Sequence, residues 1–465
     1  MSAIALNQIG LPAGETILNL KPAEAFELSR DQELAVSAIL DAAETGGRFL
    51  FITGNAGTGK STTLNRTRAR VPNIILAPTG LAAINVGGQT IHSFFRFGLG
   101  PKKKGNCRAL DETKRSILKR IRVIFIDEIS MVRADLLDAI NWTLQKTLGN
   151  DLPFGGITIV ALGDMWQLEP VVKDEEKDMF GSGKTATYRS HFWFDAKCLA
   201  VTGSLFGEEQ VKVETHELKE IFRQKNPAFI DALNEIRVGD SHGMFYMNDR
   251  AKGTPPKNCV NLAFTNKKAE TGNQEQLDQI AGESTVFEAS MEGEPDKDYP
   301  AHVKLELKVG ARVMITKNGV ASDGGNVVNG DCGEITRLTG GVWVYLDSGR
   351  EIRLDRAEWV TSEYGIDIEK DAVTKVEKGK FIQYPLKLGW WITVHKSQGQ
   401  TLDRVNLSLE RRAFSHGQLY VALSRVRTFE GLHLARKLTP SDICVNERVA
   451  ELFPPNPIQR RKFSK

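Results

Sequence analysis

The stretch that most constrains this chain is residues 54–61, which have the sequence GNAGTGKS. It follows an apolar run at residues 49–52 and precedes a polar, helix-compatible segment at residues 62–70, so we expect a strand, a glycine-rich loop and a helix in that order. The glycines let consecutive backbone N–H groups turn inward around phosphate oxygens, where a Cβ atom would block them. Lys60 adds a cation that can reach the β- and γ-phosphates, and the Ser61 hydroxyl is placed to ligate Mg²⁺. The sequence therefore predicts a site for a nucleoside triphosphate.

The composition restricts the class of protein but does not indicate a binding partner. With 465 residues and 41% hydrophobic side chains, the chain can form two to four domains with substantial cores. Lys and Arg number 61 against 58 for Asp and Glu, so any surface for nucleic acid must be local. The five cysteines lie far apart without C-x-x-C spacing, which argues against a disulfide framework and a zinc site. No secretory or mitochondrial signal and no apolar run of roughly 20 residues is visible, so we expect a cytoplasmic protein that has no membrane partner.

Acidic and amide side chains follow two further strand-like runs. Residues 121–126 show the pattern of a buried strand that ends in Asp127 and Glu128. Downstream of a phosphate-binding loop, Asp127 would hold the Mg²⁺ shell and Glu128 would orient the attacking water. Residues 156–162 form another apolar run, and Gln167 behind it could bridge the γ-phosphate to the other half of the protein. With helical crossovers between the runs, the sequence predicts a parallel, doubly wound sheet.

A second ligand is indicated where the apolar run at residues 73–77 ends in Pro78 and Thr79. A hydroxyl and backbone amides at the edge of an α/β sheet suit a phosphodiester backbone. Taken alone, His92 and the phenylalanines near it are more often core side chains, and Gln32 is more often a solvated helix residue than an adenine contact. The segment from residue 96 to 116 carries a lysine run and breaks the α/β rhythm, so we expect it to project from the sheet.

A second α/β pattern starts near residue 201. A strand-like run at residues 260–264 is followed by short alternating runs between residues 307 and 385, which are typical of a small β-barrel. Because α/β motifs resume from residue 391, we interpret the barrel as an insertion into the second domain. Arg425 lies on an expected packed helix, where an arginine can act in cis on a γ-phosphate.

The order of these motifs resembles that of the superfamily-one B helicases, and most closely the petite-integration-frequency (Pif) helicases, with the RecD and Dda helicases as relatives. The resemblance spans about residues 28–435 and is carried by the segments GNAGTGKST, IDEISMV, LPFGGITIVALGDMWQLEPV, LKEIFRQ, ITVHKSQGQTLD and GQLYVALSRVR. It implies an α/β protein of two RecA-like P-loop domains with parallel sheets, a small wedge insertion and an SH3-like β-barrel insertion. The expected division is a leader at 1–25, a first domain at 26–200 with the wedge at 96–116, a second domain at 201–306 and 386–453, the barrel at 307–385 and a tail at 454–465.

The resemblance also implies roles for individual residues, matched position by position. The implied catalytic set is Lys60, Asp127, Glu128, Gln167, Arg223 and Arg425. The implied contacts to ATP are Gln32, Gly54, Ala56, Gly57, Thr58, Gly59, Lys60, Ser61, Thr62 and Gly399, and those to the metal are Ser61 and Asp127. The residues expected to face nucleic acid are Pro78, Thr79, His92, Ser93, Phe94, Thr265, Thr393, His395 and Lys396. With the resemblance, Gln32 and His92 change from structural to functional candidates.

The implied activity is that of an ATP-dependent DNA helicase that moves 5' to 3' along single-stranded DNA and unwinds duplexes in replication, repair or recombination. The expected cofactors are ATP and Mg²⁺, and the expected partners are single-stranded DNA and forked or tailed duplex DNA, bound by a monomer. Two other functions stay open on the residues alone: a translocase or remodeller that separates no strands, and a nucleotide-binding regulator without turnover. An RNA substrate also stays open.

Overall fold

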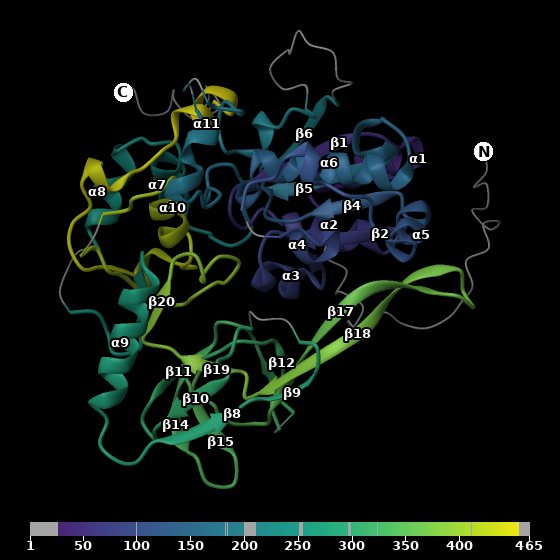
Figure 1. Cartoon of the computed structure of the whole chain (residues 1–465). Helices are drawn as coiled ribbons and strands as arrows, with labels where there is room; N and C mark the ends of the chain where they lie inside the picture. The colour runs from purple at the N-terminus through teal and green to yellow at the C-terminus, as the bar shows by residue number, and fades with distance from the viewer. Residues whose placement is uncertain are drawn as a thin grey trace, which may run out of the picture.

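The first unit of the fold is a six-stranded parallel sheet with the strand order β3-β2-β4-β5-β1-β6 (Figure 1). The computed structural model describes residues 27–98, 100–181, 183, 185–199, 211–250, 254–295, 299–322, 324–410 and 412–454. The strands of this sheet are β1 (Phe49–Gly54), β2 (Asn73–Ala77), β3 (Gln89–Thr90), β4 (Val123–Ile126), β5 (Thr158–Gly163) and β6 (Val213–Leu218). The helices that accompany it are α1 (Arg30–Thr45), α2 (Lys60–Arg68), α3 (Gly80–Val86), α4 (Ile91–Phe95), α5 (Glu112–Arg120) and α6 (Ala134–Leu148).

The two faces of this sheet belong to two different cores. Along β1, Leu50 and Ile52 pack in one cluster with residues of α1 and α2, whereas Phe49 and Phe51 pack in another with residues of α5 and α6. Successive side chains of a strand point to opposite faces, so a strand covered on both sides must be apolar throughout. The continuous apolar runs in the sequence have this origin, and the predicted parallel α/β sheet is confirmed.

The second unit is a smaller parallel sheet with the order β20-β7-β21-β22. Its strands are β7 (Val260–Ala263), β20 (Trp391–Thr393), β21 (Val405–Leu407) and β22 (Leu432–Leu434). The helices around it are α7 (Pro227–Arg237), α8 (His242–Asn248), α9 (Asn266–Asp278) and α10 (Gln418–Leu423). Strands β7 and β20 are neighbours in the sheet although more than a hundred residues separate them, because an insertion fills the interval.

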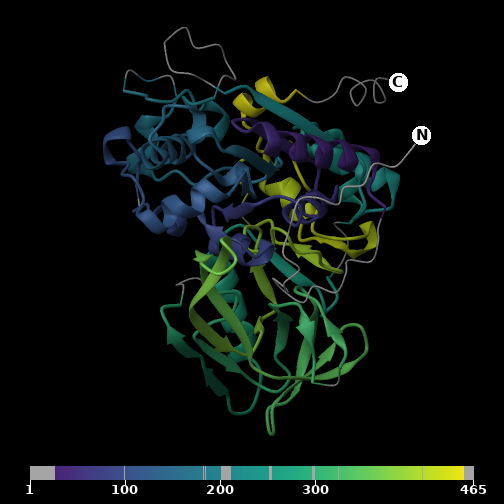
Figure 2. The same ribbon diagram turned by 90° about the vertical axis from the view of Figure 1, so that its right-hand side faces the viewer.

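The insertion is antiparallel and hangs below both α/β units in the view of Figure 2. Its main sheet has the order β16-β15-β14-β11-β19. The strands of this sheet are β11 (Arg312–Ile315), β14 (Cys332–Arg337), β15 (Val342–Leu346), β16 (Glu351–Leu354) and β19 (Leu386–Leu388). Around it lie the paired strands β8 (Thr285–Glu288) and β10 (Lys304–Leu307), the pair β12 (Gly319–Val320) and β13 (Asn326–Val327), and a sheet of β9 (Ser290–Gly293), β17 (Ala357–Asp367) and β18 (Ala372–Gln383). The predicted β insertion is confirmed.

Three domain limits differ from the expected ones. Strand β6 lies beyond the expected limit at residue 200, yet it pairs with β1 in the first sheet. The antiparallel strands begin at β8, before residue 307, and β19 extends them past residue 385. Helix α11 (Glu447–Leu452), expected in the second domain, contributes Val449 to the core of the first. These limits depend on pairing between distant segments, which local patterns do not reveal.

A long hairpin of β17 and β18 reaches from the insertion to the first domain (Figure 1). The hydroxyl of Tyr364 on β17 accepts the backbone N–H of Ile75 at 2.8 Å and donates to the carbonyl of the same residue at 3.3 Å. At the far end, Asp371 pairs with Arg120 of α5 at 2.5 Å. The hairpin therefore fastens the insertion to β2 at Ile75, a residue that pairs with Phe125 of β4 and lies one position before the pairing of β2 with β3.

Among the residues that the structure describes, no helix is long and apolar enough to cross a bilayer. The expected leader lies outside the described residues, and so does the expected tail beyond residue 454. The segment expected to form a wedge contains a short 3₁₀ turn at Lys104–Asn106 and the first turns of α5.

Candidate active site

The glycine-rich loop lies against a cavity of about 1110 Å³ between the two α/β domains. The loop follows β1, Glu128 follows β4 and Gln167 follows β5, because the carboxyl ends of parallel strands meet at one edge of a sheet. The cavity brings together these predicted residues: Gln32, Ala56, Gly57, Thr58, Gly59, Lys60, Ser61, Thr62, Glu128, Gln167, Arg223, Gly399 and Arg425. The first ten belong to the first domain, while Arg223, Gly399 and Arg425 approach from the other side.

The glycine-rich loop, called the cradle below, is too crowded at Gly57 and Gly59 for any side chain at these two positions. Gly57 has φ 85°, and a Cβ atom on it would lie 2.5 Å from the Cβ atom of Arg223. Gly59 has φ 83°, and a Cβ atom there would lie 2.2 Å from the Gln32 amide nitrogen. That amide donates to the Thr58 carbonyl at 3.1 Å and so braces the loop. The residues present fit a bound polyphosphate, since backbone N–H groups at such glycines bind phosphate oxygens.

Lys60 is the cation of the cradle. Its Nζ atom donates to the backbone carbonyls of Gly54 at 2.7 Å and of Asn55 at 3.1 Å, so the side chain folds over its own loop. Burial lowers the pKa of Lys60, and the carboxylates of Asp164 and Glu128 oppose that shift. A phosphate group at the loop would supply the negative charge that this buried ammonium needs.

Two adjacent carboxyl groups follow β4: Glu128 lines the cavity, and Asp127 lines the neighbouring cleft. Burial raises the pKa of Asp127, and the neighbouring Glu128 raises it further. Burial also raises the pKa of Glu128, against the attraction of Lys60. Two carboxylates held this way favour a divalent cation between them and a phosphate. Among the described residues, no cluster of three or more His, Cys, Asp or Glu side chains could hold a metal, so Mg²⁺ would need the Ser61 hydroxyl and phosphate oxygens besides Asp127.

Two arginines face the cavity from the second domain. Arg425 is only 1% exposed, and its Nε atom donates to the Val421 carbonyl at 2.7 Å. Burial lowers the pKa of Arg425 to about 9, and the nearby Arg223 adds to that shift. Burial also lowers the pKa of Arg223, whose Nη1 atom donates to the Ser424 carbonyl at 3.4 Å. The two guanidinium groups repel each other, and an anion bound between the domains would offset that repulsion.

Further contacts join the domains at this site, and sequence reasoning missed them. Asp164, at the end of β5, accepts from Arg237 of α7 at 2.6 Å. The Tyr420 hydroxyl accepts the backbone N–H of Ala56 at 3.1 Å. Asp164 carried a signal, because it follows a buried strand just as Asp127 does. Arg237 and Tyr420 carried none, since each looks like an ordinary residue on an amphipathic helix.

A cleft of about 720 Å³ adjoins the cavity and also lies between the domains. Of the predicted nucleic-acid residues, it holds Thr79, His395 and Lys396. The side-chain oxygen of Thr79 caps α3 by accepting the Ala82 N–H at 3.2 Å. Thr393 is buried at the base of the turn that carries His395, and its hydroxyl accepts the Lys396 N–H at 3.2 Å. The two threonines therefore shape the backbone around the cleft.

Other predicted nucleic-acid residues lie outside this cleft. Thr265 borders a separate cavity of about 290 Å³ next to Lys268. His92 and Ser93 are partly buried on α4, and Pro78 precedes the Thr79 cap. Phe94 is fully buried, with its ring 6.1 Å from the Tyr364 ring. The prediction that Phe94 faces nucleic acid is wrong, because its ring belongs to the core beneath the β17–β18 hairpin.

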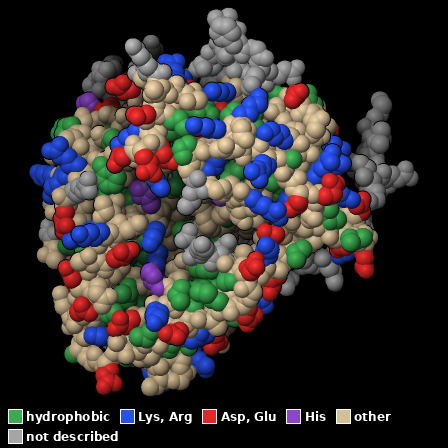
Figure 3. All heavy atoms as spheres, viewed as in Figure 1, with side chains coloured by type: hydrophobic (Ala, Val, Ile, Leu, Met, Phe, Trp, Pro, Cys, Tyr) green, Lys and Arg blue, Asp and Glu red, His purple; other side chains and the backbone are tan. Residues whose placement is uncertain are grey.

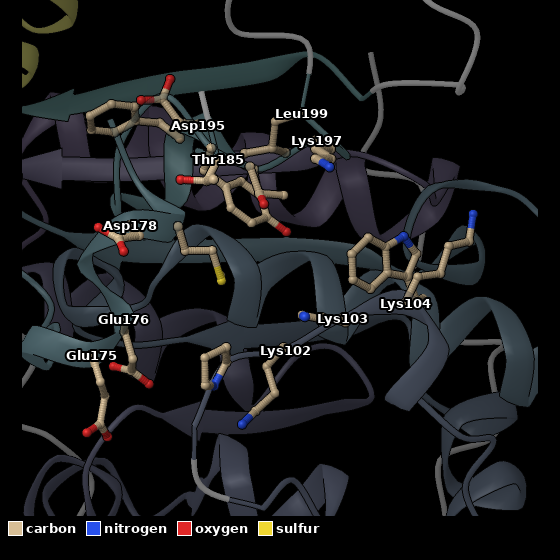
Figure 4. Close-up of a pocket in the computed structure, with 17 residues that line it drawn as sticks. Lys102, Lys103, Lys104, Glu175, Glu176, Asp178, Thr185, Asp195, Lys197 and Leu199 are labelled. Carbon is tan, nitrogen blue, oxygen red and sulfur yellow. The ribbon is translucent and has the colours of Figure 1, made fainter. Parts of the chain in front are cut away.

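A further cavity, of about 900 Å³, shares no residue with the cavity at the glycine-rich loop or with the cleft beside it. Figure 4 shows the lysine run of the expected wedge on one wall and carboxylates, among them Glu175 and Asp178, on another. Lys102 donates to the carbonyls of Gly98 at 2.6 Å and Gly100 at 2.5 Å. Figure 3 likewise shows acidic and basic side chains interspersed on one face of the molecule. Mixed charge does not favour a polyanion, so we assign this cavity no part in the site.

Comparison with known proteins places the chain in a family. A protein-family model described as "PIF1-like helicase" matches residues 27–244. The "ATP-dependent DNA helicase Pif1" of Bdellovibrio bacteriovorus is 30% identical over 453 residues, which cover 94% of this chain and 94% of that relative. The chain belongs to the PIF1-like helicase family. The resemblance inferred from the motifs is thereby confirmed.

Other members of the PIF1-like helicase family extend the comparison. The "ATP-dependent DNA helicase PIF1" of Danio rerio is 33% identical over 430 residues, which cover 88% of this chain and 61% of that relative. The chain spans about three fifths of the length of the curated vertebrate relatives it matches. The crystal structure of Bacteroides Pif1 with ADP-AlF4 has a TM-score of 0.79 at 32% identity and covers 92% of this chain and 96% of that one. The same protein bound to single-stranded DNA has a TM-score of 0.64 at the same identity and coverage.

Proposed function

We propose that the chain is an ATP-dependent DNA helicase that moves 5' to 3' along single-stranded DNA and unwinds duplexes, as in DNA replication, repair or recombination. The observation that carries the proposal is the adjacency of two openings between the domains: Ser61, Glu128 and Gly399 line both the nucleotide cavity and the neighbouring cleft. A change at the nucleotide therefore reaches the cleft through shared residues. The names of the relatives and the Bacteroides complexes support the same activity.

In the proposed reaction, the residues of this chain bind and orient the triphosphate. The loop N–H groups and Lys60 would hold the β- and γ-phosphates. Ser61 and Asp127 would hold Mg²⁺, which would supply positive charge against the charge on the phosphates. Glu128 accepts a hydrogen bond from the attacking water and aligns it with the γ-phosphate. Arg223 and Arg425 stabilise the transferred group from the second domain. Ordinary turnover thus requires both domains.

Hydrolysis would move the domains because the γ-phosphate attracts cations from both domains at once. With the triphosphate bound, Lys60 on one wall and Arg223 and Arg425 on the other attract it, and the cavity closes. When phosphate leaves, those cations repel one another and the cavity opens. The adjoining cleft changes width in the same motion, so Thr79 on one domain and Lys396 on the other alternate their hold on a strand.

The proposed substrate is the backbone of single-stranded DNA, alone or next to a fork. The cleft is lined by hydroxyl, imidazole and ammonium groups, which can bind phosphates. Contacts to phosphates do not distinguish one base from another. Sequence preference should therefore be weak, and affinity should fall as salt rises. We propose a monomer as the working unit, since one chain supplies both walls of the cavity and of the cleft.

The test compares two duplexes of equal sequence, one with a 5' single-stranded tail and one with a 3' tail, in the presence of ATP and Mg²⁺. We expect strand separation from the 5' tail only. Separation from the 3' tail alone would refute the polarity, and DNA-stimulated hydrolysis without separation from either would indicate a translocase. Glu128→Gln keeps the shape of the side chain but removes its basicity, so it should abolish turnover and still allow ATP to bind. Equal turnover in this variant would contradict the role of Glu128.

A further inference from the structure

One hydrogen bond at the active site comes from an unexpected side chain. The amide of Gln398, on the second domain, donates from Nε2 to the Oε2 atom of Glu128 at 3.0 Å. Glu128 itself is held in the left-handed region, with φ 51° and ψ 46°, so its backbone sets the direction of the side chain. The orientation of the Glu128 carboxylate therefore depends on the position of Gln398.

Gln398 belongs to the turn at residues 393–400, which also carries the residues proposed to hold DNA. The Ser397 N–H donates to the Thr393 carbonyl at 3.0 Å, and the Gln398 N–H donates to the His395 carbonyl at 3.2 Å. Buried Arg425 donates to the Ser397 carbonyl at 3.3 Å. These bonds make the turn a unit, so a displacement at His395 or Lys396 also displaces Gln398.

We propose that Gln398 is a positioning residue that keeps the Glu128 carboxylate out of its working arrangement until a nucleic-acid backbone binds the 393–400 turn. This inference rests on the proposed function, because it assigns the cause of DNA-stimulated turnover. The amide contact leaves acceptor sites on the carboxylate open but holds the group in one orientation, and a general base must point toward the attacking water. Binding of a phosphate at the cleft shifts the turn, breaks the amide contact and lets the Glu128 carboxylate turn toward the attacking water.

Gln400 provides a matched control in the same turn. Its amide donates to the Oδ1 atom of Asn329 in the insertion at 3.3 Å, away from Glu128. Gln398→Met and Gln400→Met each remove one amide and keep a side chain of similar length. Gln398 is partly exposed, so Gln398→Met should fold, and Gln398→Ala tests the same contact without added bulk. Melting temperature and oligo-dT affinity should match between the two Met variants.

The readout is the kcat of ATP hydrolysis with and without a saturating oligo-dT strand. Without DNA, Gln398→Met should raise kcat about tenfold, the factor that corresponds to one hydrogen bond to a charged group, while KM stays unchanged. With DNA it should equal the wild type, so the stimulation ratio falls by the same factor. Gln400→Met should keep the wild-type ratio.

Equal loss of kcat with and without DNA in Gln398→Met and Gln398→Ala would overturn the inference, because Gln398 would then align Glu128 for catalysis. An unchanged stimulation ratio would overturn the inference alone and leave the proposed function standing. Absence of stimulation in the wild type would overturn the proposed function, and this inference with it. Higher unstimulated kcat in both Gln398 variants, with Gln400→Met unaffected, would support it.

Discussion

Arg237→Met should weaken the contact between the two domains by about 3 kcal/mol, at the lower end of what breaking a buried ion pair costs. Arg237 donates to Asp164 from Nη2 at 2.6 Å and from Nε at 3.3 Å. The arginine side chain is 11% exposed and the aspartate 0%. Burial pushes the pKa of Asp164 upward, but Arg237 and Lys60 hold it below its ordinary value. The variant therefore leaves a buried carboxylate without its main partner.

The lower end of the range follows from what Asp164 keeps. Its carboxylate still accepts the Trp166 N–H at 3.1 Å and the Gln167 amide at 3.3 Å, and it still attracts Lys60. A loss of 3 kcal/mol shifts the equilibrium between joined and separated domains by about 10²-fold. The affinity for a nucleotide that binds between the domains should also fall. It should fall by less than this factor as long as the two domains are in contact in most molecules.

Urea unfolding followed by tryptophan fluorescence suits this measurement, because the Arg237 guanidinium lies 5.6 Å from the Trp166 ring. The first transition of Arg237→Met should move to lower urea at similar slope. In the double variant with Asp164→Asn, the carboxylate that lost Arg237 is itself neutral, so most of the loss should return, less the attraction between Asp164 and Lys60. If Arg237→Met unfolds at the same urea concentration as the wild type, the ion pair does not stabilise the contact between the domains. The same conclusion follows if the loss of stability in the double variant equals the sum of the losses in the two single variants.

Two further changes test the cradle and the hairpin. Gly57→Ala puts a Cβ atom 2.5 Å from that of Arg223 at φ 85°, so ATP affinity by calorimetry should fall at least about tenfold, and wild-type affinity would show that the loop adapts. Tyr364→Phe removes both hydrogen bonds to Ile75 and leaves its buried N–H unpaired, which should cost about 1–3 kcal/mol in thermal unfolding. Hydrogen exchange at the Ile75 amide should speed up, and unchanged protection would mean that the hairpin is not what shields it.

The residues that line the cavity at the glycine-rich loop were largely predictable from the sequence, and those of the neighbouring cleft only in part. The loop that carries Lys60 follows β1 and Asp127 follows β4, so the rule that parallel strands end at one edge of a sheet already brings them together. Phe94 was misassigned, because a residue two positions from His92 can face the core or the solvent depending on what packs above it. Here that is Tyr364, which is 270 residues further along the chain.

The sequence by itself determined the chemistry of this protein: the phosphate loop, the paired carboxylates and the parallel sheet that aligns them follow from local order and spacing. Only the tertiary structure decided the partners of those groups. The pairing of β6 with β1, the Asp164–Arg237 ion pair and the Gln398–Glu128 hydrogen bond each join segments of different domains or sequence regions. Such contacts form because chain folding brings the surfaces together, and no periodicity along the chain encodes which distant side chain will lie opposite.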